Sequence, residues 1–289
     1  MSKIAITTDT NSGMIPHQNE DQGVFVLPMP FVIDGECLLE TVDLSREGFY
    51  EKLIAGSKVS TSQPSTADVA EFWNNILKEY DEIVHIPTSS CLSASCATAQ
   101  ALSKEFNGKV HVVDNHRISV ALKSSVFNAV TLREQGKTPE EIKAILEEQH
   151  TDYVIYFSLE SMEYLKRGGR ISPAVAAIGS MLKLRPVLQL KGEKLEKFSM
   201  PRTLVKAKDI MKNAILNDLN GKFKEYTKKG EMRICIAHAE NKQDAEAFKE
   251  EMEKDFPNIP VLYCDPISLS IGCHTGPATI AVGCMRVIQ

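Results

Sequence analysis

The chain has 289 residues, a formal net charge of −5 and 25% charged residues, a composition typical of a globular protein. The acidic balance, without a Lys/Arg-rich run, argues against a nucleic-acid surface, and no apolar run reaches the roughly 18 residues of a membrane span. The first residues turn polar early, and the seven cysteines include no Cys-x-x-Cys pair, so we expect free thiols and a cytoplasmic location.

Short apolar runs in the first part of the chain each end in polar residues. They cover residues 4–6, 83–86, 110–113 and 153–157. Helical stretches separate them, and in residues 66–80 the apolar side chains fall on one helix face. The alternation predicts right-handed βαβ units, that is, a parallel Rossmann-like sheet with helices on both faces. We place this first α/β domain at residues 1–158.

The pattern changes after about residue 160. We expect a helix over residues 172–184 and a hairpin of residues 186–190 and 195–198, then a long helix ending near residue 225. Further strands are expected at residues 232–237, 260–264 and 279–287, with a helix over 244–256 between the first two. The second part, residues 159–289, is therefore predicted to be a mixed, mainly antiparallel α/β domain with helices on one side.

A cluster of hydroxyl side chains follows the predicted strand that ends at Ile86. It comprises Thr88, Ser89, Ser90, Ser93 and Ser95, just before an Ala-rich helical segment. A strand, a polar loop and a helix start direct hydroxyls and free backbone N–H groups toward one point. That point favours a carboxylate or a phosphate. The alternative is that one serine only caps the helix.

Three more motifs carry polar groups in loops. A hydroxyl-rich loop covers residues 59–65, and Arg167-Gly168-Gly169-Arg170 places two guanidinium groups beside glycines. The third motif sets His274 between glycines in residues 272–278. Each has a structural alternative: a helix entry, a glycine C-cap and a structural histidine, respectively.

These motifs, in this order and spacing, resemble the DegV family. The resemblance rests on Thr61-Ser62-Gln63-Pro64-Ser65, Ser89-Ser90-x-Leu-Ser93, Tyr164-Leu165-Lys166-Arg167-Gly168-Gly169-Arg170 and His274-Thr275-Gly276-Pro277. Thr8-Asp9-Thr10, Val113-Asp114, Arg185-Pro186 and Pro201-Arg202-Thr203 agree as well. The match covers a single DegV unit over about residues 3–287.

The resemblance implies a two-domain protein that holds one long-chain fatty acid, such as palmitate or oleate, between its domains, with no cofactor. Some DegV proteins are the B subunit of bacterial fatty acid kinase and present the carboxylate to a separate ATP-dependent kinase subunit, which makes an acyl phosphate. The resemblance further implies that the carboxylate is surrounded by Thr61, Ser62, Ser93, His274 and Thr275. Arg170 and Arg202 are expected as contacts to the phosphate or the partner.

The chain also departs from the family pattern. Cys91 and Ala94 stand where glycine is usual, and Ala278 replaces the last glycine of His-Thr-Gly-Pro-Gly. Asn115 follows Asp114 where serine is usual. The added Cβ atoms limit positive φ and close backbone approach, so they could reshape the head-group site or narrow the tunnel. The preferred chain length is therefore not carried over.

Other function classes lack their motifs. The sequence has no Gly-x-Ser-x-Gly elbow of a serine hydrolase, no Gly-rich phosphate loop ending in Gly-Lys-Ser/Thr, and no clustered Cys/His metal ligands. We therefore expect a lipid-binding carrier with no catalytic or metal-ligating residues of its own. The alternative is a stand-alone enzyme that acts on a small anionic substrate at the Ser/Thr/His cluster.

Overall fold

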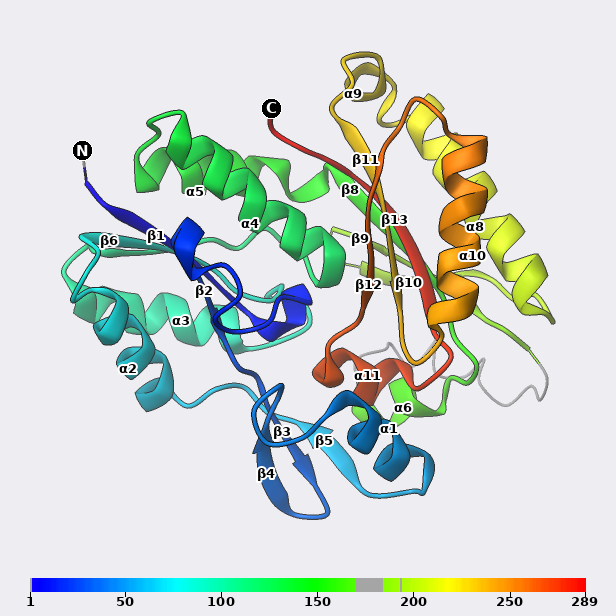
Figure 1. Ribbon diagram of the computed structural model, residues 1–289, viewed down its shortest axis with the longest axis horizontal. Coiled ribbons are helices and arrows are strands. Elements are labelled where there is room, and N and C mark those ends of the chain that lie inside the picture. Colours follow the sequence, from blue (N-terminus) through cyan, green and yellow to red (C-terminus); the bar gives the residue numbers. More distant parts are fainter. Residues whose placement is uncertain (1, 170–183, 193) are drawn as a thin grey trace. The chain divides into compact units, whose positions relative to one another are not determined.

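The computed structural model describes residues 2–169, 184–192 and 194–289 (Figure 1). The chain packs as two compact units. Unit 1 contains the chain up to Arg46, Lys58–His150 and Ile288–Gln289, and unit 2 contains Glu47–Ser57 and Thr151–Val287. Within the described residues, no helix is long and apolar enough to cross a membrane. The helix expected over residues 172–184 lies almost entirely outside the described residues.

Unit 1 is built on a four-stranded parallel sheet, as predicted. The strand order is β2-β1-β6-β7, and all three pairings are parallel. The strands are β1 (Ile4–Asp9), β2 (Val24–Leu27), β6 (Glu82–Ile86) and β7 (Val110–Val112). All six residues of β1 are buried, as expected for a central strand of a sheet covered on both faces.

Helices cover both faces of this sheet, which confirms the predicted layering. The helices are α2 (Thr66–Ile76), α3 (Ser95–Ser103), α4 (Ser119–Glu134) and α5 (Pro139–Glu148). Trp73 of α2 packs with Ile83 of β6 in one apolar cluster, whereas Leu122 of α4 packs with Val84 in the other. Successive residues of β6 thus face opposite layers, and Figure 1 shows α4 and α5 on one side of the sheet and α2 and α3 on the other.

Two helix starts in unit 1 are fixed by local sequence. Ser65 and Asp68 form a reciprocal capping box at α2. Thr138 and Glu141 form another at α5, with Pro139 at the first helical position. Both boxes follow from local sequence, Ser-x-x-Asp at residues 65–68 and Thr-Pro-Glu-Glu at residues 138–141, and such caps contribute about 1 kcal/mol each because they satisfy backbone N–H groups that the helix leaves free.

Unit 1 also contains a small antiparallel sheet that the sequence did not predict. Its order is β4-β3-β5. The strands are β3 (Pro30–Ile33), β4 (Glu36–Leu39) and β5 (Val59–Thr61). Short 3-10 helices complete the unit at Thr10–Ser12, Glu20–Gln22 and Lys104–Phe106, and a further one, Gln149–Thr151, spans the passage to unit 2.

Unit 2 is built on a six-stranded mixed sheet in the order β10-β9-β8-β13-β11-β12. Only β11 and β12 pair in parallel, so the predicted mixed, mainly antiparallel sheet and its β9–β10 hairpin are confirmed. The strands are β8 (Tyr153–Ser158), β9 (Val187–Lys191), β10 (Lys194–Ser199), β11 (Met232–His238), β12 (Val261–Pro266) and β13 (Ile280–Arg286).

Strand β8 corrects the sequence analysis, which grouped its residues with the parallel strands of the first domain. In the structure β8 pairs antiparallel with β9 and β13, both of which follow it in the chain. The chain therefore passes into unit 2 before this strand. A buried apolar run looks the same in either kind of sheet, so only the pairing partners decide the assignment.

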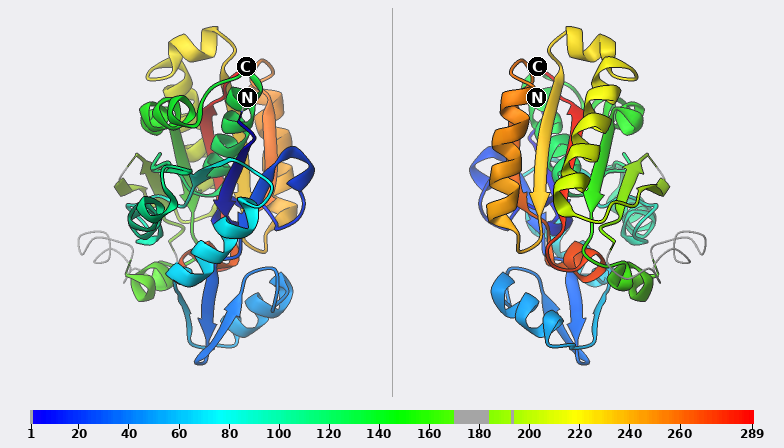
Figure 2. Two further views of the ribbon diagram at one scale, coloured as in Figure 1. Left: turned by 90° about the vertical axis from the view of Figure 1, so that its left-hand side faces the viewer. Right: turned by 90° about the vertical axis from the view of Figure 1, so that its right-hand side faces the viewer.

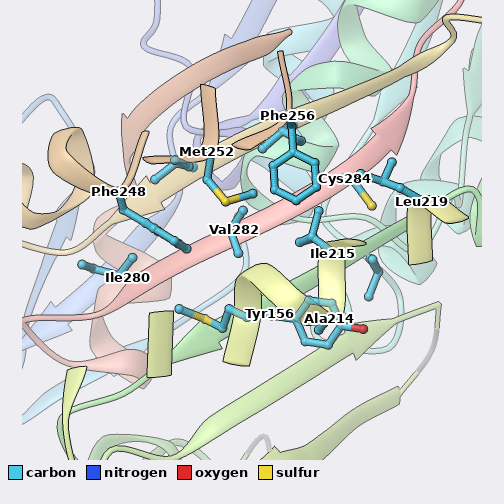
Figure 3. Close-up of a cluster of buried hydrophobic side chains, with 14 of the residues drawn as sticks. Tyr156, Ala214, Ile215, Leu219, Phe248, Met252, Phe256, Ile280, Val282 and Cys284 are labelled. Atoms are coloured by element: carbon cyan, nitrogen blue, oxygen red, sulfur yellow. The ribbon is translucent and has the colours of Figure 1, made fainter. Parts of the chain in front are cut away.

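Two helices cover one face of the mixed sheet. They are α8 (Leu204–Asn220) and α10 (Lys242–Asp255), and in Figure 2 they run beside β11 and β13. Figure 3 shows Phe248 of α10 and Ile215 of α8 packed around Val282 of β13. The long helix expected to reach residue 225 instead stops at Asn220, where Gly221 caps it, and α9 (Lys224–Lys228) follows. Three shorter helices are α1 (Arg46–Ile54), α6 (Glu163–Gly168) and α11 (Leu269–Thr275).

Candidate functional site

A buried carboxylate links the carboxyl ends of β1 and β6 in unit 1. Asp9 is 2% exposed, and its oxygens accept hydrogen bonds from the Thr88 backbone N–H (2.7 Å), the Thr88 hydroxyl (2.8 Å) and the Asn11 backbone N–H (3.0 Å). Burial raises the pKa of Asp9, and the three donated hydrogen bonds oppose that rise. Thr88 begins the hydroxyl-rich loop, so Asp9 fixes the point at which that loop leaves the sheet.

In the sequence, Asp9 stands out only as part of Thr8-Asp9-Thr10, which matches the family pattern without implying a role for Asp9. A polar residue at the end of a buried strand is the signal that could have identified it. Thr10 extends the same network, because its hydroxyl donates to the buried Glu40 carboxylate at 2.8 Å and accepts from the Met29 backbone N–H at 3.1 Å. The network therefore ties β1 to the segment around the small sheet as well as to the hydroxyl-rich loop.

The hydroxyl-rich loop is not a simple helix cap. Helix α3 begins at Ser95, and its N-cap residue is Ala94, which provides no side-chain hydrogen bond. Ser93 makes one local bond, since its hydroxyl accepts from the Ser95 backbone N–H at 3.2 Å. Ser89 is buried, and its carbonyl accepts from the Ser93 backbone N–H at 3.0 Å. Capping thus uses one of the five hydroxyls, and Ser93 is partly exposed at the start of the helix.

The loop of residues 61–65 lies against the same helix. Thr61 is the last residue of β5, and the neighbouring Ser62 is exposed, with its hydroxyl donating to the Gln63 carbonyl at 3.2 Å. The Thr98 hydroxyl of α3 donates to the Gln63 side chain at 3.3 Å. In unit 1 the loop that contains Thr61 and Ser62 therefore lies against α3, the helix that follows the loop with Ser93.

A small cavity lies beneath these two loops. It measures about 10 Å³ and is lined in part by Asp9, His85, Pro64 and Ser95. A cavity of this size holds about one water molecule, so it cannot hold an acyl chain. The buried Ser95 hydroxyl has no hydrogen-bond partner among the described residues. The cavity is therefore a water-sized space beside the loops and not a tail tunnel.

His85 at this cavity carries no charge near neutral pH. It is buried, and burial lowers its pKa to about 3. Its Nδ1 lies 2.8 Å from the Thr7 hydroxyl. Its ring packs edge-on against the Trp73 ring, with 5.2 Å between the ring centroids. The small cavity beside the hydroxyl-rich loops is thus lined by a neutral imidazole and not by a positively charged one.

In unit 2 the motif with His274 forms the end of a helix, not the loop that we expected. Helix α11 spans Leu269–Thr275, is capped by the Ser268 hydroxyl and carries His274 in its last turn. His274 is half-buried and Thr275 is 8% exposed. The Thr275 hydroxyl has no hydrogen-bond partner among the described residues. A buried hydroxyl without a partner is costly, so this atom is suited to contact a polar ligand group.

The motif of residues 164–170 packs against the His274 motif through two glycines. A Cβ added at Gly168 would lie 1.9 Å from His274 Nδ1, and one added at Gly276 would lie 2.2 Å from Cδ2 of Tyr164. Each motif therefore contributes a ring that covers a glycine of the other. Gly272 of α11 is similarly close to Tyr50 of α1, because a Cβ there would lie 2.5 Å from the Tyr50 hydroxyl. These contacts fix where His274 can lie.

Arg185 connects two further motifs of unit 2. Its guanidinium donates to the Ala278 carbonyl at 3.3 Å and to the Glu160 carboxylate at 3.2 Å, and its backbone N–H donates to the Pro201 carbonyl at 2.7 Å. Arg202 follows Pro201, is exposed and precedes the N-cap of α8. Of the two arginines expected near a phosphate or partner, Arg202 is on the surface of unit 2. Arg170 lies outside the described residues.

Only one of the three glycine replacements requires a backbone that favours glycine. Ala278 has φ of 56°, whereas Cys91 and Ala94 do not have positive φ. Ala94 is in the ordinary right-handed helical region with φ of −73°. The expected restriction by an added Cβ therefore applies at Ala278 and not at the other two positions.

Comparison with known proteins agrees with these motifs. The family pattern described as "uncharacterised protein, DegV family" matches residues 3–287. The chain belongs to the DegV family. A DegV domain-containing protein of Clostridium perfringens is 31% identical over 295 residues, which cover 98% of this chain and 97% of that protein. Protein DegV of Bacillus subtilis is 28% identical over 283 residues, or 96% of this chain and 98% of that one.

Solved DegV structures have the same fold. A DegV family protein from Thermus thermophilus, described by its fatty acid binding, has a TM-score of 0.85 and 28% identity and covers 99% of this chain and 100% of its own. DegV from Bacillus subtilis, described as a fatty acid binding protein, has a TM-score of 0.82 and 26% identity with the same coverage. The predicted two-part α/β fold class is confirmed.

Proposed function

We propose that this chain binds one long-chain fatty acid, such as palmitate or oleate, and contacts its carboxylate with Thr61, Ser62, Ser93, His274 and Thr275. The observation that carries the proposal is the full-length likeness to two DegV proteins described as fatty acid binding. The hydroxyl loops of unit 1 and the His274 motif of unit 2 are the parts of this chain that supply suitable donors.

The chemistry of these residues suits reversible carboxylate binding. A buried carboxylate that lacks donors costs several kcal/mol. Hydroxyls and an imidazole supply donors without a permanent positive charge, so the ligand can leave again. The Asp9 carboxylate takes its hydrogen bonds from Thr88 and Asn11, so it does not engage the hydroxyl of Ser62 or Ser93. A 16-carbon tail would add up to roughly 12 kcal/mol at about 0.8 kcal/mol per CH₂, reduced by association and ordering costs.

The finer part of the proposal concerns a partner. The chain presents the bound carboxylate to a separate ATP-dependent kinase subunit, which forms the acyl phosphate, and Arg170 and Arg202 contact the phosphate or the partner. A guanidinium keeps its charge and matches phosphate oxygens with two parallel hydrogen bonds. Arg202 is exposed on unit 2, where a partner can reach it.

Loss of a head-group hydroxyl tests the first part. Ser93→Ala and Thr61→Ala should each weaken oleate binding by about 1–3 kcal/mol, or roughly 5- to 150-fold, because a donor to a charged group is lost. Ser103→Ala is the matched control, since this partly exposed serine at the end of α3 only donates to the Gln100 carbonyl. Equal oleate affinity in all three variants and the parent would show that the hydroxyl loops do not hold the carboxylate.

Arg170→Ala tests the second part. The variant should retain its fatty acid but lose acyl-phosphate formation when a DegV-compatible kinase subunit and ATP are supplied, and Arg170→Lys should recover little. Arg167→Ala is the charge-matched control, since Arg167 is engaged with Glu163 and Tyr164 within α6. Equal loss of lipid and turnover would make Arg170 a ligand-holding residue. Turnover with ATP alone would support the stand-alone enzyme instead.

A further inference from the structure

A histidine and two glutamates meet at one edge of the parallel sheet, away from the hydroxyl loops. Glu82 is the first residue of β6, His111 is the middle residue of β7, and Glu140 is the second residue of α5. His111 Nε2 lies 3.3 Å from Glu82 Oε1 and 3.7 Å from Glu140 Oε1. The hydroxyl loop leaves the opposite end of β6, so this cluster is separate from the proposed carboxylate site.

The spacing of the three atoms fits a zinc ion. Zinc binds histidine nitrogen at about 2.0–2.1 Å and carboxylate oxygen at about 2.0–2.2 Å, so the ligand atoms of a tetrahedral site are roughly 3.3–3.5 Å apart. The three atoms here all lie within 4.8 Å of one another. Glu140 has a side chain that is 69% exposed, so a small rotation can bring its oxygen closer to that of Glu82.

The surroundings favour a cation. Neither glutamate forms an ion pair with a lysine or arginine within the described part of the chain, so two carboxylates face one imidazole. The Ser2 hydroxyl donates to Glu82 Oε2 at 2.6 Å, which leaves Oε1 directed at His111. Such an outer hydrogen bond orients metal-ligating carboxylates. The His111 side chain is 11% exposed and is held on a strand, so the central ligand is fixed by the fold.

We propose that Glu82, His111 and Glu140 bind one Zn²⁺ ion, with water in the fourth position. Bound zinc links the first turn of α5 to β6 and β7. Zinc that binds only the folded state also stabilises unit 1 in proportion to the logarithm of its concentration.

Titration calorimetry with zinc chloride near neutral pH tests the site. The background is the Cys37→Ser/Cys91→Ser variant, which removes the two exposed thiols as competing ligands. We expect one Zn²⁺ per chain. His111→Ala should weaken binding at least about 100-fold and Glu140→Gln at least about 10-fold, because even outer-shell losses cost 10- to 100-fold.

His17→Ala is the matched control. His17 forms a similar pair with Glu20 at 2.8 Å but lies outside the three-residue cluster, so its loss should leave zinc affinity unchanged. Glu140 is exposed, so Glu140→Gln should fold, and its melting temperature should rise less with zinc than that of the parent. Absence of zinc binding in the parent, or undiminished binding in both His111→Ala and Glu140→Gln, would overturn the proposal. Loss of binding in His17→Ala would overturn it as well.

Discussion

The two units position their motif residues by different means. In unit 1, hydrogen bonds to the buried Asp9 and Glu40 carboxylates hold the segments around the hydroxyl-rich loops. In unit 2, glycines let two motifs approach closely, with His274 against Gly168 and Tyr164 against Gly276. Polar networks are sensitive to the loss of one partner, whereas close contacts are sensitive to one added methyl group.

This difference explains which departures from the family pattern the chain can accommodate. Cys91 and Ala94 of unit 1 add side chains where the backbone has ordinary φ and the residues are exposed. Ala278 of unit 2 adds a methyl group at a backbone position with φ of 56°. The same kind of replacement is therefore nearly neutral in one unit and strained in the other.

Gly276→Ala should have the largest effect on stability. The backbone there has φ of 72° and ψ of 177°, a region essentially restricted to glycine, and the new methyl group would overlap the Tyr164 ring. We expect the free energy of unfolding to fall by about 2–5 kcal/mol, as the sum of backbone strain and overpacking. Urea denaturation measures the loss.

Gly192→Ala is the control for that experiment, because Gly192 also has positive φ, 58°, but an added Cβ there meets open space. It should cost only the roughly 1–2 kcal/mol of left-handed backbone strain. Equal losses of unfolding free energy in Gly276→Ala and Gly192→Ala would show that the close contact with Tyr164 contributes nothing. Close glycine contacts would then not be what positions the motifs of unit 2.

Asp9→Asn should be the most damaging conservative change in unit 1. The amide places a donor where the carboxylate accepts from Thr88 and Asn11, so at least one buried hydrogen bond is lost. We expect a decrease of about 2 kcal/mol in the free energy of unfolding. Asp81→Asn, at an exposed carboxylate that accepts one backbone N–H, should change it by less than about 0.5 kcal/mol. If Asp9→Asn changes the free energy of unfolding as little as Asp81→Asn does, Asp9 does not anchor the loop.

The buried His85 predicts how stability depends on pH. Its pKa is about 3 in the folded protein and near 6.5 in the unfolded chain, so between these values the unfolded chain binds one more proton. The free energy of unfolding therefore falls as the pH falls below about 6.5, by up to about 1.4 kcal/mol per pH unit from this residue.

His85→Asn keeps an acceptor near the Thr7 hydroxyl and should flatten that pH dependence, whereas His17→Asn, at an exposed histidine, should not. Denaturation at several pH values between 4 and 7, roughly the window set by the two pKa values, measures the slopes. The raised pKa of Asp9 gives a slope of opposite sign that is common to all three proteins. An identical slope in His85→Asn and the parent would contradict a neutral buried imidazole.

Ala278→Gly should change the free energy of unfolding least, and it should raise rather than lower it. It relieves roughly 1–2 kcal/mol of left-handed strain but adds about 0.4–1 kcal/mol of unfolded-state entropy, so we expect a gain of about 0.5 kcal/mol. Ala94→Gly, at ordinary φ, gains no such relief and should leave stability unchanged or slightly lower. A higher melting temperature for Ala94→Gly than for Ala278→Gly would contradict the backbone argument.

Features set by local sequence were predictable. The capping boxes at Ser65 and Thr138 and the β9–β10 hairpin depend on residues within a few positions of each other, and all three are present. The parallel sheet followed from the alternation of strands and helices, since few topologies satisfy that order.

Features set by distant contacts were not predictable. The assignment of β8 depends on β13, more than a hundred residues later in the chain. Helix α11 was missed because Gly272 suggests a loop, whereas in the structure it allows the helix to approach Tyr50. The roles of Asp9 and Gly168 were likewise hidden, because each depends on a residue from another motif, Thr88 and His274 respectively.

Native mass spectrometry of the freshly purified chain, followed by solvent extraction, tests the central claim most directly. The account predicts one long-chain fatty acid per chain, which leaves slowly because a buried tail gains about 0.8 kcal/mol per CH₂. It also predicts a lower occupancy in Ser93→Ala than in Ser103→Ala. A parent protein that carries no fatty acid and takes up none when oleate or palmitate is added would contradict it.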